Sequence, residues 1–370
     1  MIYIIHEITI LKAFGILLVV GGHVGGFLNW IGIPWSNNAE IFPAYSFHMP
    51  LFFFASGYFY NSKYDSQIYT LLRKRISSLV IPYYKWNLFY GLLVTFLIIN
   101  LNFSKGNILS ISNFLFEPWI SGYQYNLNGP AWFVLCLFLS QILYVLSRKL
   151  FFATLNYLSL DIKVNFDYLL LIIYILLGLL CTYLSINYNI LNNVYIYILI
   201  RTTFSIQFLH FGYCYKNYIK TYITFNIYTF LILISTKICF IEIAKNYTFS
   251  MRTLIFRDEV FMPIITSFLG ILYILHLVAF IKTLLDKYPS ASLEKHISFL
   301  GDNTWSIMMH HMLFNYILLS LYDFISLEIF DYMNFIFMTF VLPIGCTYLP
   351  ILFDKSISKI STSMISKIPK

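Results

Sequence analysis

Long apolar stretches separated by short polar connections dominate this chain. They fall at about residues 8–28, 45–61, 79–100, 130–147, 168–186, 193–213, 222–241, 260–284, 303–322 and 334–353. A helix needs about 20 mainly apolar residues to cross the hydrocarbon core of a bilayer. The pattern therefore predicts an all-α polytopic membrane protein with about ten transmembrane helices.

The composition agrees with this prediction. Of the 370 residues, 59% are hydrophobic and 11% are charged, whereas a soluble domain has about 25% charged residues. No basic segment precedes the first apolar stretch and no A-x-A-like site follows it, so we expect a spanning helix there and not a cleaved signal peptide. We expect a single membrane-embedded domain over residues 1–370 and no soluble domain.

The net charge of +8 is distributed unevenly between the two sets of connections. With the N-terminus inside, the outer connections hold only Lys105, Lys245, Arg252 and Arg257. The inner connections and the C-terminal tail hold Lys63, Arg73, Lys74, Arg75, Arg148, Lys149, Lys163, Lys216, Lys220, Lys282, Lys287, Lys295, Lys355, Lys359, Lys367 and Lys370. The positive-inside rule then predicts that both termini are cytoplasmic. The surplus charge indicates topology and contact with membrane lipids, and not a nucleic-acid partner.

The first apolar stretch carries two ionisable residues in the string LKAFGILLVVGGHV, namely Lys12 and His23. An ionisable side chain at membrane depth costs roughly 2.5–3.5 kcal/mol and suggests a functional site. Eleven residues make about three helical turns, so both side chains share one face, about 16 Å apart. His23 could act as a general base, because a neutral imidazole accepts a proton near pH 7. The alternative is a buried histidine that bonds a neighbouring helix.

Two further strings leave structural and functional interpretations open. In FHMPLFFFASGYFY, residues 47–60, His48 begins the stretch and a small Ser56-Gly57 pair lies within it. Such a pair favours close helix packing, and Ser56 could be a nucleophile only beside a base. In RKRISSLVIPYYKW, Arg73 and Arg75 with the intervening lysine are either a topology anchor or a phosphate-binding cluster.

The string GDNTWSIMMHHMLF, residues 301–314, holds the adjacent His310 and His311. Neighbouring helix residues point about 100° apart, so only one of the two should face a common site.

Arg201 and Lys237 also lie within apolar stretches and need partners or a wet cavity. Glu117, Asp258 and Glu259 are candidate partners, and either cation could line a polar tunnel for an acceptor. The five cysteines are scattered without a C-x-x-C pair, so neither a disulfide framework nor a metal site is expected.

Together with GPAWFVLCLF, these strings occur in the order seen in acyltransferase family 3, which the chain resembles from the first stretch to about residue 314. Members are bacterial integral-membrane enzymes that O-acetylate surface polysaccharides and related sugars. Lys12-x10-His23 matches the basic-x10-histidine hallmark of the family. His311 matches the histidine of its serine-x4-histidine pattern, counted from Ser306, and His48 matches the histidine before Met-Pro. The family often has arginine where this chain has Lys12 and aspartate where it has Thr9.

The resemblance implies an O-acetyltransferase in the inner membrane of a bacterium that takes acetyl-CoA from the cytosol and needs no metal. It implies a sugar or lipid-linked oligosaccharide as acceptor, as in capsule, O-antigen or exopolysaccharide synthesis. Together, the residues and the resemblance give His23, Lys12 and His311 as candidate catalytic residues, and Arg75, Arg73, His48, Ser56, Trp132 and Arg201 as candidate substrate-binding residues.

Two mechanisms and one other function stay open. His23 could deprotonate the acceptor hydroxyl, or it could carry the acyl group as a covalent relay. The competing function is a transporter or flippase of a lipid-linked sugar, which predicts internal repeats. The sequence shows no clear repeat, and this function leaves the Lys12-x10-His23 spacing unexplained.

Overall fold

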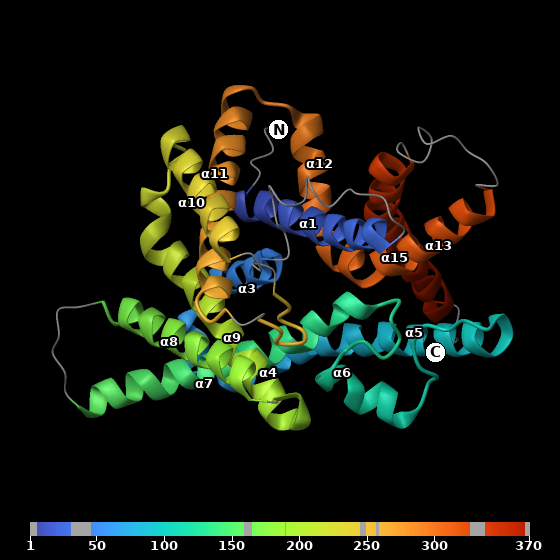
Figure 1. Cartoon of the computed structure of the whole chain (residues 1–370), viewed down its shortest axis with the longest axis horizontal. Helices are drawn as coiled ribbons and strands as arrows, with labels where there is room; N and C mark the ends of the chain where they lie inside the picture. The colour runs from blue at the N-terminus through green and yellow to red at the C-terminus, as the bar shows by residue number, and fades with distance from the viewer. Residues whose placement is uncertain are drawn as a thin grey trace.

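The computed structural model describes residues 6–30, 46–158, 165–188, 190–244, 249–256, 259–325 and 337–366, and these residues are almost entirely helical (Figure 1). The α-helices are α1 (Glu7–Trp30), α3 (His48–Tyr58), α4 (Ile68–Arg75), α5 (Ile81–Leu101), α6 (Glu117–Ile120), α7 (Trp132–Tyr157), α8 (Phe166–Asn187), α9 (Val194–Cys214), α10 (Ile227–Ala244), α11 (Met262–Lys287), α12 (Ala291–Asp302), α13 (Thr304–Ile325) and α15 (Leu342–Ser366). Short 3-10 or π turns are η2 (Ser62–Asp65), η3 (Ile76–Val80), η4 (Ser112–Phe116), η5 (Gly129–Ala131), η6 (Ile190–Asn192), η7 (Tyr215–Ile219), η8 (Lys220–Tyr222) and η9 (Phe337–Val341).

Side chains that precede several helices fix where these helices begin. Asn165 caps α8, Asn193 caps α9 and Ser290 caps α12, each by accepting a hydrogen bond from a backbone N–H of the first turn. Such caps satisfy donors that have no partner within the helix. The polar connections between apolar stretches therefore set the helix boundaries.

The prediction of an all-α membrane protein is confirmed, whereas the number of about ten spans is not. Within the described residues, six segments are long and apolar enough to cross a membrane: Glu7–Val24, Ile68–Leu101, Gly129–Tyr157, Phe166–Asn187, Val194–Tyr222 and Met262–Lys287. The stretch expected at 45–61 contains only α3, whose 11 residues make a helix about 16 Å long at 1.5 Å per residue. Helix α3 is therefore too short to span a bilayer by itself.

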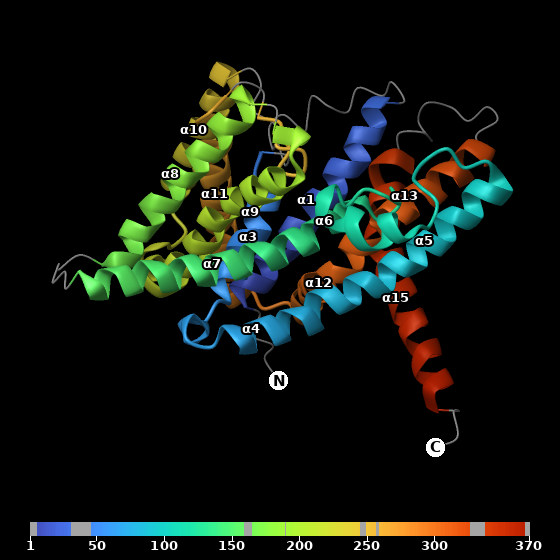
Figure 2. The same cartoon turned by 90° about the horizontal axis from the view of Figure 1, so that it is seen from below.

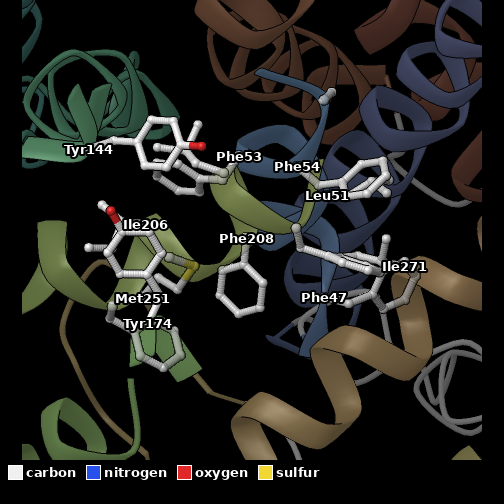
Figure 3. Close-up of a cluster of buried hydrophobic side chains, with 14 of the residues drawn as sticks. Phe47, Leu51, Phe53, Phe54, Tyr144, Tyr174, Ile206, Phe208, Met251 and Ile271 are labelled. Carbon is white, nitrogen blue, oxygen red and sulfur yellow. The ribbon is translucent and has the colours of Figure 1, made fainter. Parts of the chain in front are cut away.

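Helix α3 is buried among other helices and packs most closely on α9. A Cβ atom at Gly57 would lie 1.7 Å from the carbonyl oxygen of Leu209, and one at Gly212 would lie 2.0 Å from that of Phe54. The two backbones thus touch at two glycines, as the Ser56-Gly57 pair predicts. Around this contact lies a core that includes Phe47, Leu51, Phe53, Phe54, Tyr144, Tyr174, Ile206, Phe208, Met251 and Ile271 (Figure 3).

A buried ion pair ties α7 to α8 and to the turn η2. The Arg148 guanidinium is 2% exposed, and it donates to Asp167 over 2.8 Å and to Asp65 over 3.3 Å. The Tyr218 hydroxyl donates to the same Asp167 over 2.5 Å. The sequence places Arg148 among the surface cations that indicate topology. The structure corrects this, because burial of a guanidinium requires the paired carboxylates found here.

One side of the molecule gathers the first turns of α1, helix α4 and the connection from α11 to α12 (Figure 2). There Lys220 forms a salt bridge of 3.1 Å with Glu7 and a hydrogen bond of 3.3 Å with the Tyr58 hydroxyl. The cytoplasmic position of this side stays a prediction from charge.

Cysteine labelling tests this orientation. In a Cys239→Ser background, which removes the exposed thiol found among the described residues, Leu115→Cys should react with an impermeant maleimide in intact cells. Ser62→Cys should react only after permeabilisation. Labelling of Ser62→Cys in intact cells would reverse the orientation.

The contact between α3 and α9 makes Gly57→Ala a severe change. Overpacking costs about 1–3 kcal/mol, and a clash with a rigid carbonyl puts the loss near the upper end. The melting temperature of the purified protein should fall clearly. Gly21→Ala is the matched control, since nothing lies within 4 Å of its added Cβ. Equal melting temperatures of the two variants would contradict the close packing.

Candidate active site

Two histidines that are far apart in the sequence lie against each other. The rings of His23 on α1 and His311 on α13 have centroids 5.1 Å apart and an interplanar angle of 47°. Both residues are expected from the sequence to be catalytic, and the fold places them at one point. Their contact forms the centre of the candidate site.

The hydrogen bonding of His311 defines which of its nitrogens is available. Its Nδ1 lies 2.8 Å from the carbonyl oxygen of Ile307, one helical turn earlier, so Nδ1 must donate. Its Nε2 is buried and has no hydrogen-bond partner among the described residues. A neutral imidazole with its proton on Nδ1 presents a lone pair on Nε2. His311 is therefore set up to accept a proton or an acyl group at Nε2.

The neighbouring His310 faces a different helix. Its Nδ1 lies 2.8 Å from the Tyr90 hydroxyl, and its ring packs edge-on against Trp86 with centroids 4.2 Å apart. Both partners belong to α5. The two adjacent histidines thus diverge as helix geometry predicts, and His311 is the one that meets His23.

A cavity of about 110 Å³ opens beside His23, and we call it the His23 cavity. Its polar and aromatic lining comprises His23, His48, Trp132, Ser250 and Arg252, and its apolar lining includes Val19, Phe52 and Met308. His48 and Trp132 are expected from the sequence at a substrate site, and both face this cavity. Two histidines and an arginine therefore line one small space, and a third histidine, His311, lies against the ring of His23.

Arg252 is the residue of this cavity that the sequence did not reveal. It lies in the segment 249–256, where an antiparallel bridge joins Ser250 to Ile255. The Tyr197 hydroxyl donates to the Arg252 carbonyl, and the guanidinium lies over the Tyr123 ring, 4.4 Å from its centroid. No carboxylate pairs with Arg252 among the described residues. The sequence shows that Arg252 is charged but not that it lies near His23, because only the tertiary fold brings the segment 249–256 back to α1.

Arg201 supports the cavity wall without reaching the cavity. Its guanidinium donates to the carbonyl oxygens of Trp119 and Ile120 over 2.8 Å each, and to the Tyr197 hydroxyl over 3.1 Å. It also lies 5.6 Å from the ring centroid of Trp132. These contacts favour the structural alternative for Arg201 over the tunnel alternative, because backbone carbonyls accept from two of its nitrogens.

Two of the acidic partners proposed from the sequence do not pair with the two buried cations. Neither Glu117 nor Glu259 forms an ion pair within the described part of the chain, and Asp258 lies outside that part. Lys237 donates to the Ser46 hydroxyl over 2.8 Å and lies 4.0 Å from the Phe47 ring centroid. It therefore supports the segment that leads into α3.

Lys12 lies in a second cavity of about 240 Å³, which we call the Lys12 cavity. Its lining includes Lys12, Phe52, Ser56, Phe133, Thr304 and Met308. Asp302, in the last turn of α12, is the carboxylate whose charge acts on Lys12. The family often has an aspartate where this chain has Thr9. In this chain, Asp302 supplies a negative charge near Lys12 instead.

Ser56 faces this cavity as a hydrogen-bonded residue. Its hydroxyl accepts a bond of 2.5 Å from the side-chain amide of Gln141 on α7. Among the described residues, no histidine bonds Ser56 in the way that an activated serine nucleophile requires of a Ser–His pair. The packing interpretation of the Ser56-Gly57 pair therefore fits best.

The two arginines expected to bind phosphate lie outside both cavities. Arg73 is exposed, whereas the Nε of Arg75 is buried and has no partner among the described residues. Leu79 follows Arg75 by about one turn, lies in the π turn η3 and lines the Lys12 cavity. Arg75 therefore lies next to this cavity. A π turn follows it directly, and π turns often occur near functional sites.

The two cavities meet at Phe52 and Met308, which line both of them. On α3, His48, Phe52 and Ser56 follow one another at intervals of four residues and so share a helix face. On α13, Thr304, Met308 and His311 do the same at intervals of four and three. These spacings are visible in the sequence, and the side chains that they align extend from one cavity to the other.

The serine of the family pattern, Ser306, bonds Asp354 of α15 and so lies away from the histidines. Within the described ranges, no group of three or more histidine, cysteine, aspartate or glutamate side chains is arranged to hold a metal ion.

Comparison with known proteins assigns the chain to a family. Searches of curated proteins and of solved structures found no match. A family model described as an acyltransferase domain matches residues 5–352, which is nearly the whole chain. The six candidate spans among the described residues make the chain a multi-pass membrane protein. The chain therefore belongs to acyltransferase family 3 and is a membrane acyltransferase.

Proposed function

We propose that this acyltransferase moves an acetyl group from cytosolic acetyl-CoA to a sugar hydroxyl of a surface polysaccharide or its lipid-linked precursor, in the inner membrane of a bacterium. The observation that carries this proposal is the contact between His23 and His311 at the edge of the His23 cavity, which adjoins the Lys12 cavity at Phe52 and Met308. One cavity holds a cation near the predicted cytoplasmic side, and the other is covered by a segment predicted to lie outside. This arrangement supports a donor and an acceptor that arrive from opposite sides.

The donor side of the proposal rests on Lys12 and Arg75. A coenzyme A molecule carries phosphates, which cations bind through charge-assisted hydrogen bonds. Lysine acts as a point charge and arginine as a planar fork, so Lys12 gives attraction without bidentate geometry. With its phosphates near Arg73 and Arg75, the donor would extend its thioester along the Lys12 cavity toward the histidines.

The reaction then proceeds at the histidine pair. An imidazole, at His311 Nε2 or at His23, accepts the proton of the sugar hydroxyl, and the oxygen attacks the thioester carbonyl. The carbon–sulfur bond breaks, and the proton passes to the departing thiolate. In the relay form, the imidazole nitrogen attacks the thioester carbonyl and expels the thiolate; the sugar oxygen then displaces the imidazole, and the hydroxyl proton passes to the thiolate. Arg252 lies on the acceptor side, where its positive charge would favour the oxyanion of the tetrahedral intermediate.

The assay for the proposal is transfer of radiolabel from acetyl-CoA to glycan extracts in membrane vesicles that contain the protein. Labelled glycan should appear with the wild type and not with vesicles that lack the protein. Uptake or flipping of a lipid-linked sugar without any labelled product would instead support a transporter.

Glutamine substitutions should separate the two adjacent histidines. Glutamine keeps hydrogen bonding but cannot take up a proton, and loss of a general acid/base costs about 10²–10⁴-fold in rate. We expect His311→Gln to lose at least about 100-fold in kcat. The matched control His310→Gln can still bond Tyr90 and should keep most activity. Equal losses would show that the pair has only a shared structural role.

Replacement of His23 tests the other member of the contact. His23→Ala should abolish transfer while the protein stays folded and inserted, because it removes an imidazole at the reacting centre. The purified variant should keep the wild-type elution volume in size-exclusion chromatography. Retention of more than about a tenth of the activity would exclude His23 as the base or relay.

Lys12 should act on donor binding. Lys12→Ala should raise KM for acetyl-CoA with little change in kcat, since a lost ground-state interaction appears in KM. Lys12→Arg keeps the charge and should keep KM close to that of the wild type. A lower kcat with an unchanged KM would instead show that Lys12 stabilises the transition state.

A further inference from the structure

We propose that Phe52 and Met308 form a constriction that limits the acyl group to a short chain, so that acetyl passes to the histidines and longer acyl groups do not. This inference rests on the proposed function and names the residues that set donor specificity. Phe52 and Met308 line both the Lys12 cavity and the His23 cavity. An acyl group that enters from the Lys12 cavity must therefore pass between these two side chains.

The ring of Phe52 is held in place from both sides. On α1, a Cβ atom at Gly15 would lie 3.2 Å from Cζ of Phe52, so the glycine leaves just enough room for the ring. On α7, the Phe133 ring lies against it with centroids 5.9 Å apart and an interplanar angle of 60°. These two contacts restrict the rotation of the half-buried ring, because interiors packed this closely leave little free space.

Met308 closes the passage from the opposite helix. It lies on α13, three residues before His311 and four after Thr304, so these side chains share one face. A thioether side chain is unbranched and adapts to its surroundings. The constriction thus combines one fixed element, Phe52, with one that can adjust to a small group.

The space beyond the constriction is small. The His23 cavity measures about 110 Å³, less than half of the about 240 Å³ of the Lys12 cavity. An acyl group that passes the constriction therefore enters a smaller space, which favours an acetyl group over a hexanoyl group.

The chemistry of transfer is the same for every chain length. The carbon–sulfur bond of the thioester breaks, a carbon–oxygen bond to the acceptor forms, and the hydroxyl proton ends on the coenzyme A sulfur. Selectivity must then come from whether the thioester carbonyl reaches His23 and His311. The difference should appear already in donor binding, before any transfer.

The test measures donor binding to the purified full-length protein by competition with radiolabelled acetyl-CoA. Unlabelled coenzyme A, acetyl-CoA, butyryl-CoA and hexanoyl-CoA are the competitors. The wild type should bind acetyl-CoA at least about tenfold more tightly than hexanoyl-CoA. Phe52→Ala should reduce this ratio to less than about threefold, and Phe52→Leu and Met308→Ala should give intermediate ratios. The two milder variants keep the test informative if Phe52→Ala does not fold.

Two controls separate the constriction from general loosening. Phe96→Ala removes a ring that is 58% exposed on α5, away from both cavities, and should keep the wild-type ratio. Val145→Ala removes buried volume on α7 outside both cavities and should also keep this ratio.

The outcomes distinguish this inference from the proposed function. Equal binding of all acyl lengths by the wild type, or an unchanged ratio in all three variants at Phe52 and Met308, would overturn the constriction and leave acetyl transfer standing. Failure of acetyl-CoA and coenzyme A to bind at all would overturn both.

Discussion

The backbone contact between α3 and α9 is the constraint on which the site depends. Helix α3 is too short to span a bilayer, so it is held by neighbours and not by the membrane. Because Gly57 and Gly212 have no side chains, the two backbones touch, and α3 is fixed in position and rotation. That rotation directs His48, Phe52 and Ser56 along one face toward the two cavities. A shift of α3 would disturb both cavities and the passage between them together.

Polar groups inside this apolar protein fall into two kinds. Arg148 and Arg201 have their charges matched by carboxylates or carbonyls, and removal of one partner of a buried pair typically costs about 3–5 kcal/mol. These residues stabilise the fold. His311 differs in its position: its Nε2 is buried without a partner among the described residues, as is that of His310, but the His311 ring lies against His23. An unpaired buried acceptor is costly, so its presence beside His23 points to chemistry and not to stability.

Lys12 and His23 lie along one face of α1, and the helices that cross α1 determine which cavities this face borders. By itself the spacing suggests one continuous groove. The structure divides that groove into two cavities, with Phe52 and Met308 between them. Division suits a transferase better than a transporter, because two substrates can be held apart until only the reacting groups meet. The segment that carries Arg252 covers the second cavity and is held there by Tyr197, which Arg201 in turn supports.

The sequence by itself determined the all-α membrane class, the family and the pairing of a basic residue with a histidine on one face of α1. These features are local: apolar length sets the helices, and the 3.6-residue period sets a shared face. It also predicted that His310 and His311 diverge, since neighbouring helix residues must. Only the tertiary structure decided the length of α3, the partners of Arg201 and the place of Arg252. Each of these depends on contacts between segments far apart in the chain, and neither hydropathy nor helical spacing contains information on which distant segments meet.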